Sequence, residues 1–305
     1  MSWILIVEQS LNGLQFGLML FLLAAGLTLV FGIMDMINLA HGSLYMLGAF
    51  LASSFVQATG SFVAGVLLAI PATALLGMIL EISILRTLYA RDHLSQVLAT
   101  FALILILNEV VRLIWGSDAA LSAPEALSGP VQLLPGLLYP SYRLVIIAVG
   151  VGVAALLYVL VAKTRIGMLV RAGASNREMA LAMGVDIRTL FTAVFGVGAG
   201  LCALAGAMLA PLFAVQVGMG ESILILAFVV IVIGGIGSIR GALVGSLLVG
   251  IVDTIGRAFL PILFGAFLPP QFASAAGPAI GSVMIYLLMA VVLYFRPQGL
   301  FPARG

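Results

Sequence analysis

Long apolar runs, separated by short polar breaks, make up most of the chain. A helix needs about 20 apolar residues to cross the hydrocarbon layer of a membrane. Because the breaks at 34–38 and near 240 are very short, one segment could be re-entrant. The pattern predicts an all-α polytopic membrane protein, a bundle of eight or nine transmembrane helices with broken or re-entrant segments. The candidate spans are 11–33, 39–57, 62–85, 94–115, 143–162, 189–214, 222–239, 241–262 and 279–296.

The composition agrees with lipid as the solvent of this chain. Of the 305 residues, 63% are hydrophobic and only 8% are charged, whereas soluble domains carry roughly 25% charged residues. The net charge of +2 is too small to indicate a nucleic-acid partner. The first apolar stretch has no basic residue before it, so we expect it to remain as a span rather than to be removed as a signal peptide. We expect one transmembrane domain over 1–305.

The basic residues predict the orientation of the chain. If nine spans alternate, the loop 163–188 lies on the basic, cytoplasmic side and the loop 116–142 lies outside. The N-terminus is then outside and the C-terminus in the cytoplasm. The outer loop holds four prolines, which predicts an irregular cap over the outer mouth. Ten of the 13 basic residues fall on the cytoplasmic side: Arg86, Arg91, Lys163, Arg165, Arg171, Arg177, Arg188, Arg240, Arg296 and Arg304.

One stretch of the cytoplasmic loop carries the signals of a short helix. Ser175 and Glu178 have the spacing of a capping box, and Gly184 stands where a helix ends in the left-handed conformation. A helix this short is marginal in isolation. It should therefore dock, either on the bilayer or its own protein, or in a groove of a partner subunit. Its apolar face holds Met179, Ala182 and Met183. The candidate contact residues are Ser175, Asn176, Glu178, Met179, Ala182, Met183 and Gly184.

The break between the first two spans gathers three polar side chains, Asp35, Asn38 and His41. Polar groups near membrane depth are costly and need a reason. They could close the turn between two helices, which we favour, or line the path of a polar solute. A metal site is not expected, because the two histidines, His41 and His93, lie in different breaks without ligand spacing.

Other polar residues interrupt the spans themselves. Asp253 and Arg257 are four residues apart, so they share a helix face and can neutralise each other. We interpret them as a structural pair that faces the bundle interior, with a proton-relay element as the alternative. Further candidates for lining a path are Asn12, Gln15, Asn108 and Glu109.

Two kinds of chemistry have no candidate residues. The single lysine, Lys163, has no phosphate-cradling glycine loop before it, so we do not expect this chain to hydrolyse ATP or to need a cofactor. No serine, histidine and aspartate gather on one side of the membrane, so we expect no catalytic residues and no enzyme activity.

Six segments, in order along nearly the whole chain, match the pattern of one known family. They are Gly26-Leu-Thr-Leu29, Asn38-Leu-Ala-His-Gly42, Met46-Leu-Gly-Ala49, Asn176–Val185, Gly234–Gly245 and Phe295–Phe301. With these segments the chain resembles the permease subunit of branched-chain amino acid ABC importers. The resemblance implies an ABC importer permease fold in a bacterial inner membrane. It also implies a homologous second permease subunit, two cytoplasmic ATPases that use the ATP, and a periplasmic substrate-binding protein. The segment Asn176–Val185 resembles the ATPase-contacting loop of that family.

Two positions depart from the family pattern and leave the solute open. Ser43 replaces a common acidic residue, and Asp253 stands where glutamate is usual. The main prediction is translocation of branched-chain or related amino acids. The alternatives are a permease for urea or short amides, and a secondary transporter whose coupling site would be Asp253 or Glu109. A passive channel and an intramembrane enzyme come after these.

Overall fold

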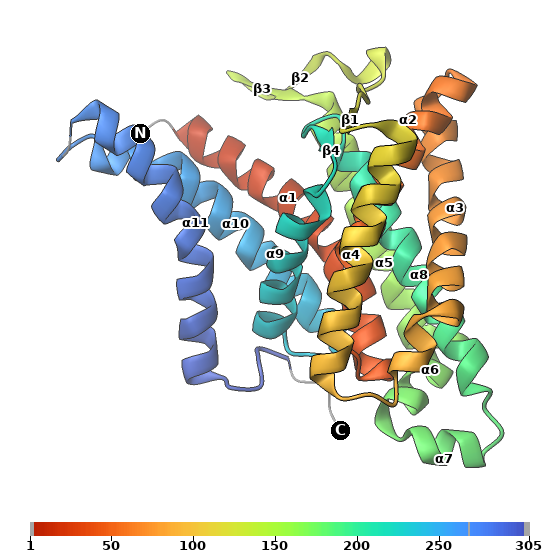
Figure 1. The fold of residues 1–305 in the computed structure, drawn as a ribbon. Helices are drawn as coiled ribbons and strands as arrows, with labels where there is room; N and C mark the ends of the chain where they lie inside the picture. Colours follow the sequence, from red (N-terminus) through yellow and green to blue (C-terminus); the bar gives the residue numbers. More distant parts are fainter. Residues whose placement is uncertain (1–2, 268, 302–305) are drawn as a thin grey trace.

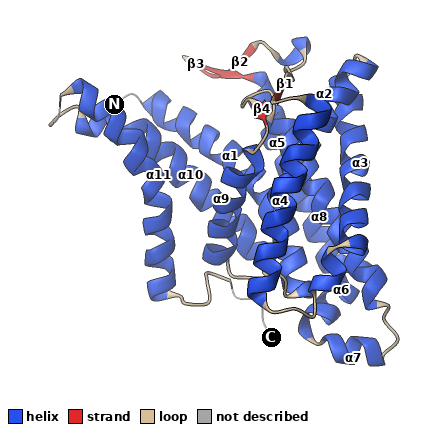
Figure 2. Ribbon diagram, viewed as in Figure 1, coloured by secondary structure: helices blue, strands red, loops and turns tan. Residues whose placement is uncertain are grey.

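The computed structural model describes residues 3–267 and 269–301, which form a bundle of helices (Figure 1). The helices are α1 Trp3–Met34, α2 His41–Thr59, α3 Phe62–Ser83, α4 His93–Trp115, α5 Ser141–Lys163, α6 Arg165–Ser175, α7 Arg177–Ala182, α8 Ile187–Leu209, α9 Met219–Gly234, α10 Ile239–Phe264 and α11 Pro270–Phe295. Short strands appear at one end of the bundle only (Figure 2): β1 Asp118–Ala119, β2 Pro130–Leu134, β3 Leu137–Pro140 and β4 Val215–Gln216. The 3-10 turns η1 Leu85–Leu88 and η2 Glu125–Leu127 complete the described elements.

Each of the nine predicted spans has a helix in the structure. Within the described residues, seven helices are long and apolar enough to cross a membrane, and α9 is a shorter apolar helix. The chain is therefore a multi-pass membrane protein of helical class. Four predicted boundaries are wrong by five residues or more: α1 begins at Trp3, α11 begins at Pro270, α8 ends at Leu209, and α9 ends at Gly234. Pro278 lies inside α11. The helix tolerates this proline because it keeps its remaining backbone hydrogen bonds.

The helices α2 and α9 both begin inside the bundle. After α1 the chain folds back along this helix. His41 comes so close to Gly26 that a Cβ atom added to this glycine would lie 3.0 Å from the His41 Nε2 atom. Gly26 is eight residues before the end of α1, a depth of about 12 Å. The first turn of α9 meets the first turn of α2, where the backbones of Gly42 and Gly220 touch. Two interrupted segments therefore occur, at the breaks before α2 and α9, in agreement with the broken or re-entrant segments that the sequence predicts.

The outer loop is more regular than predicted. β2 and β3 form an antiparallel hairpin, in which Pro130 pairs with Pro140, so the prediction of an irregular cap is wrong. The hairpin forms because Pro135 and Gly136 make its two-residue turn, with a φ of 87° at Gly136, a conformation that glycine adopts readily. The prolines at the strand ends do not interrupt the ladder. β1 pairs with β4 and ties this loop to the segment before α9.

The basic residues gather at the opposite end from the hairpin. By the order of the helices, η1, α6, α7, the start of α8 and the end of α11 share one end of the bundle (Figure 1). All of the predicted cytoplasmic basic residues lie at this end, except Arg304, which is outside the described residues. The chain therefore presents one strongly basic end and one end that carries the strands.

Backbone contact between α1 and α10 holds the centre of the bundle together. A Cβ on Gly250 would lie 2.5 Å from the Gly13 carbonyl oxygen and 2.6 Å from the Gly17 Cα atom. Small residues at such crossings allow helices in lipid to approach closely. The abundance of glycine is therefore explained here by packing.

The segment after α11 caps the end of α9. The Leu300 amide donates to the Ile233 carbonyl at 2.9 Å, and the Phe301 amide donates to the Gly234 carbonyl at 2.9 Å. The last carbonyls of a helix have no partner within the helix. The tail therefore supplies partners for two carbonyls at the α9 break.

Candidate functional site

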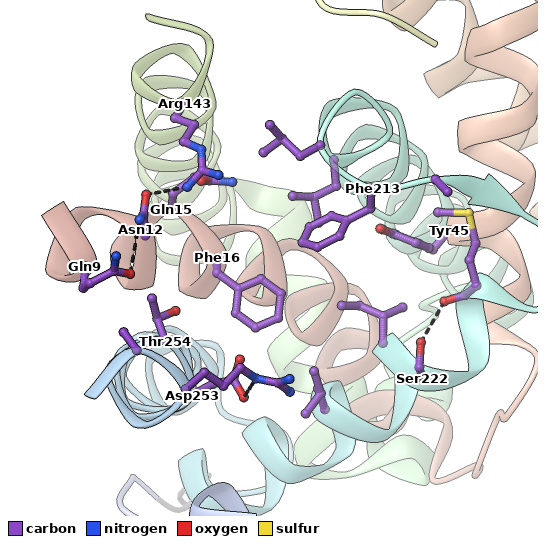
Figure 3. A pocket seen from close by; sticks show the side chains of 18 of the residues that line it. Gln9, Asn12, Gln15, Phe16, Tyr45, Arg143, Phe213, Ser222, Asp253 and Thr254 are labelled. Carbon is purple, nitrogen blue, oxygen red and sulfur yellow. Dashed lines mark hydrogen bonds and ion pairs between the residues drawn. The ribbon is translucent and has the colours of Figure 1, made fainter. Parts of the chain in front are cut away.

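A recess of about 760 Å³ opens between α1, α9 and α10, and combines polar and apolar walls (Figure 3). Its apolar surface includes Phe16, Phe213, Leu226 and Ile223. Its polar side chains come from six different segments of the chain. They are Gln9, Asn12, Gln15, Tyr45, Arg143, Gln216, Ser222, Asp253, Thr254 and Arg257. Such a surface can contact a solute that has both charged and aliphatic parts.

One corner of the recess is a hydrogen-bonded group from α1, β3 and α5. The Asn12 Oδ1 atom accepts from the Arg143 Nη1 atom at 2.5 Å and from the Tyr139 hydroxyl at 2.9 Å. The Asn12 Nδ2 atom donates to the Gln9 Oε1 atom at 3.3 Å. Two donors on one oxygen fix the orientation of the Asn12 amide. The predicted path residues Asn12 and Gln15 both line the recess.

The opposite wall carries an ion pair within α10. The Arg257 Nε atom lies 2.8 Å from the Asp253 Oδ1 atom. Asp253 is only 6% exposed, whereas the Arg257 side chain is about half exposed, at 48%. Asp253 is 14 residues from the start of α10, about 21 Å along the helix, and therefore near its middle. The predicted pairing is confirmed by this geometry, while its role is taken up below.

The polar residues of the first break lie outside the recess. The Asn38 Oδ1 atom accepts from the Ala40 amide at 3.0 Å and so closes the turn before α2. His41 is fully buried, with its Nε2 atom 3.0 Å from the Cys202 Sγ atom. Asp35 follows the last residue of α1, has a φ of 50° and is exposed. Asn38 therefore contacts its own turn, and His41 contacts α8.

The two candidates on α4 also lie outside the recess. The Asn108 Nδ2 atom donates to the Glu221 Oε1 atom at 2.7 Å, which joins α4 to the first turn of α9. Glu109 forms an exposed ion pair with Arg112 at 3.0 Å. The structure therefore gives Asn108 a helix-joining contact and leaves Glu109 at the surface.

Several lining residues were missed by the sequence analysis. Gln9 precedes Asn12 by three residues, and this helical spacing could have identified it. Arg143 stands at the start of an apolar span, and no local pattern relates it to the polar residues of α1. Tyr45 and Ser222 belong to α2 and α9, whose starting depth no sequence pattern reveals.

The short helix α7 lies at the basic end. Its N-cap is Asn176, whose Oδ1 atom accepts from the Met179 amide at 2.8 Å. The predicted capping box is wrong, because Ser175 is the last residue of α6, and Glu178 falls at the second position of a helix that ends at Ala182. Gly184 has the predicted left-handed conformation, with a φ of 83°. The side chains of Met179, Ala182 and Met183 are exposed, and Met183 most of all, at 80%.

A fully buried carboxylate stands at the basic end of the bundle, between α3, η1 and α8. Glu81, near the end of α3, accepts from the Arg86 Nε and Nη2 atoms at 3.1 and 2.9 Å. It also accepts from the Tyr89 hydroxyl at 2.9 Å and the Thr192 hydroxyl at 2.7 Å. Burying a charge is unfavourable unless hydrogen bonds and an opposite charge compensate it. These contacts tie α3, η1 and α8 together at the basic end.

The helix α8 is the next helix after α7, and Asp186 is its N-cap. The Asp186 Oδ1 atom accepts from the Arg188 and Thr189 amides at 3.1 and 3.2 Å, and the Thr189 hydroxyl donates to the Oδ2 atom at 2.5 Å. The hydrogen bond from the Thr189 side chain is the main cause that lowers the pKa of Asp186, and the backbone donors add to it.

Replacing Asp186 with alanine is expected to lower the Tm at neutral pH. The pKa of Asp186 is lower in the folded protein than its ordinary value of 3.8. Its stabilising contribution is therefore complete above that value and is lost as the pH falls through the folded pKa. Thermal unfolding in detergent should show a difference between Asp186→Ala and the unchanged protein that shrinks at low pH. Asp186→Asn is the control, because an uncharged cap should keep its advantage over alanine at every pH.

These features are those expected of a membrane permease: a multi-pass helical bundle with a recess whose lining is both polar and apolar. The family described as "Branched-chain amino acid transport system / permease component" matches residues 9–293. Because the match covers nearly the whole chain, the chain belongs to this family.

Named relatives cover most of the chain. The high-affinity branched-chain amino acid transport system permease protein BraD of Pseudomonas aeruginosa is 29% identical, over 96% of this chain and 95% of the relative. The permease protein LivH of Escherichia coli, of the same kind of system, is 28% identical, over 83% of this chain and 87% of the relative. A probable branched-chain amino acid transport permease protein LivH of Methanocaldococcus jannaschii is 28% identical, over 92% and 88%. No solved structure matches the chain significantly.

Proposed function

We propose that this chain is a membrane subunit of an ATP-driven importer of branched-chain amino acids, and that the recess is its part of the translocation path. The observation that carries the proposal is the mixed lining of the recess in a chain of this family. Charged and amide groups suit the polar end of an amino acid, and Phe16, Leu226 and Ile223 suit an aliphatic side chain.

The proposed orientation follows the basic residues. The end that carries α6 and α7 faces the cytoplasm, and the end that carries the hairpin faces outward, with the N-terminus outside and the C-terminus inside. The membrane is the bacterial inner membrane. Support comes from the concentration of arginine around η1, α6 and α7.

The proposed partners are a homologous second permease subunit, two cytoplasmic ATPases and a periplasmic substrate-binding protein. The recess is partly open, and its polar groups at membrane depth would be costly against lipid. A second permease subunit over this opening would remove that cost. ATP would be used by the ATPases and not by this chain, which has no phosphate-cradling loop.

The proposed contact with an ATPase is the α7 helix. Its exposed apolar face, Met179, Ala182 and Met183, fits a groove in a cytoplasmic partner. The Asn176 cap and the left-handed Gly184 fix both ends of this helix. Because α7 leads directly into α8, movement of the ATPase would reach the bundle through α8.

Changing Met183 to glutamate is expected to reduce ATPase binding at least about tenfold, because a charge replaces an apolar contact at the centre of the interface. The measurement is the amount of ATPase that co-purifies with the permease in mild detergent. The matched control is Leu181→Glu, since Leu181 is 51% exposed on the same helix but off the apolar face. If the two variants co-purify with the same amount of ATPase, the apolar face of α7 is not the contact with the ATPase.

Reconstitution tests the transport function directly. Proteoliposomes that hold this chain, its homologous partner and both ATPases, with the binding protein outside and ATP inside, should take up labelled leucine. Omission of any one subunit should stop uptake. Uptake by this chain alone under an ion gradient, or uptake of urea but not leucine, would contradict the proposal.

A further inference from the structure

We propose that the Asp253–Arg257 pair recognises the two charges of the amino acid: the Asp253 carboxylate meets the solute's ammonium group, and the Arg257 guanidinium meets its carboxylate. The inference rests on the proposed function and names the groups in the recess that select a zwitterion. It departs from the structural role that spacing alone suggests for this pair.

The pair leaves hydrogen-bonding capacity on both partners. Their contact joins the Arg257 Nε atom to the Asp253 Oδ1 atom. Within the described residues, the Asp253 Oδ2 atom and the terminal nitrogens of Arg257 have no hydrogen bond. A guanidinium can bind a carboxylate through two parallel N–H donors, and an unused carboxylate oxygen can accept from an ammonium group.

The other ion pairs of the described residues do not share this arrangement. Glu81 is saturated, because Arg86, Tyr89 and Thr192 all donate to its two oxygens. The Glu109–Arg112 pair is exposed on α4 and does not line the recess. Asp253 and Arg257 line the recess together, and half of the Arg257 side chain is accessible there.

The surroundings of the pair suit the rest of the solute. Phe16 lines the same recess as Asp253 and Thr254 (Figure 3), and Leu226 and Ile223 are part of the same lining. A zwitterion has no net charge, so a neutral ion pair can receive it without leaving an uncompensated charge at membrane depth. A simple fatty acid or amine would leave one partner without a counter-charge.

The test replaces both charges with apolar residues of similar size. Removing both partners of an ion pair leaves no uncompensated charge, and such a replacement is often neutral for stability. The double change Asp253→Leu with Arg257→Met should therefore still co-purify with the other subunits. If the pair recognises the solute, ATP-driven leucine uptake should fall at least about tenfold. Uptake within about twofold of the unchanged complex would overturn the inference.

A matched control and a second variant keep the result interpretable. Glu109→Leu with Arg112→Met makes the same chemical change outside the recess and should leave leucine uptake unchanged.

Asp253→Arg with Arg257→Asp keeps an ion pair but exchanges the positions of its charges, so a purely structural pair would still allow uptake. Loss of uptake by an assembled swapped variant supports recognition. Failure of both recess variants to assemble would overturn the inference, because it would assign the pair to folding.

The unchanged complex separates this inference from the proposed function. If it shows no ATP-dependent leucine uptake, the proposed function fails. If it takes up leucine and the recess variants do so equally well, only the role of Asp253 and Arg257 is overturned.

Discussion

Glu81→Ala is expected to destabilise the protein by about 3 kcal/mol. The change removes a fully buried carboxylate that accepts from the Tyr89 and Thr192 hydroxyls and the Arg86 guanidinium. Breaking a buried ion pair typically costs about 3–5 kcal/mol. We expect the lower part of that range, because one-third of the Arg86 side chain is exposed and water can replace its partner. Equilibrium unfolding in mixed detergent measures the difference.

The control for Glu81 is another glutamate in an ion pair. Glu109 and Arg112 are 57% and 58% exposed, and exposed pairs contribute less than about 1 kcal/mol. Glu109→Ala should therefore leave the unfolding transition nearly unchanged. Similar losses in the two variants would show that burial and the extra hydrogen bonds of Glu81 add nothing.

Gly250→Val is expected to cost about 3 kcal/mol, at the upper end of the usual cost of overpacking. A Cβ at this position would meet backbone atoms of Gly13 and Gly17 at 2.5–2.6 Å. Backbone atoms cannot rotate away as a side chain can, so α1 and α10 would have to separate. The measurement is the unfolding free energy, with the yield of folded protein as a second indicator.

Gly152 is the matched control for this change. It lies in the middle of α5, and a Cβ there would meet no atom within 4 Å. Gly152→Val should change the unfolding free energy by no more than about 0.5 kcal/mol, since valine and glycine differ little in helix propensity. A loss as large as that of Gly250→Val would mean that glycine matters here for a reason other than packing.

Most spans were predictable from the sequence because seven of the described helices are long and apolar enough to cross a membrane. The depth of the helix starts was not predictable. His41 follows a break that hydropathy places at the membrane edge, yet the chain folds back to the level of Gly26. This return depends on contacts between α2, α8 and α9, which are far apart in the sequence.

The candidate site was predictable only where its residues share a helix. Asp253 and Arg257 were recognised together because they are four residues apart on α10. Arg143 and Asn12 are 131 residues apart, and no local pattern relates them. The α7 cap shows a limit of a different kind. Ser175 and Asn176 are both good caps, and the choice between them depends on where α6 ends.

The two amides that cap α9 impose an order on biosynthesis. Leu300 and Phe301 leave the ribosome after every helix of the bundle, yet they satisfy carbonyls of residues made almost 70 positions earlier. Until then the Ile233 and Gly234 oxygens at this break must be hydrated or paired with other groups. The hydrogen bonds at the α9–α10 break therefore form only after Leu300 and Phe301 have been synthesised, and a chain cut before Leu300 would lack these two donors.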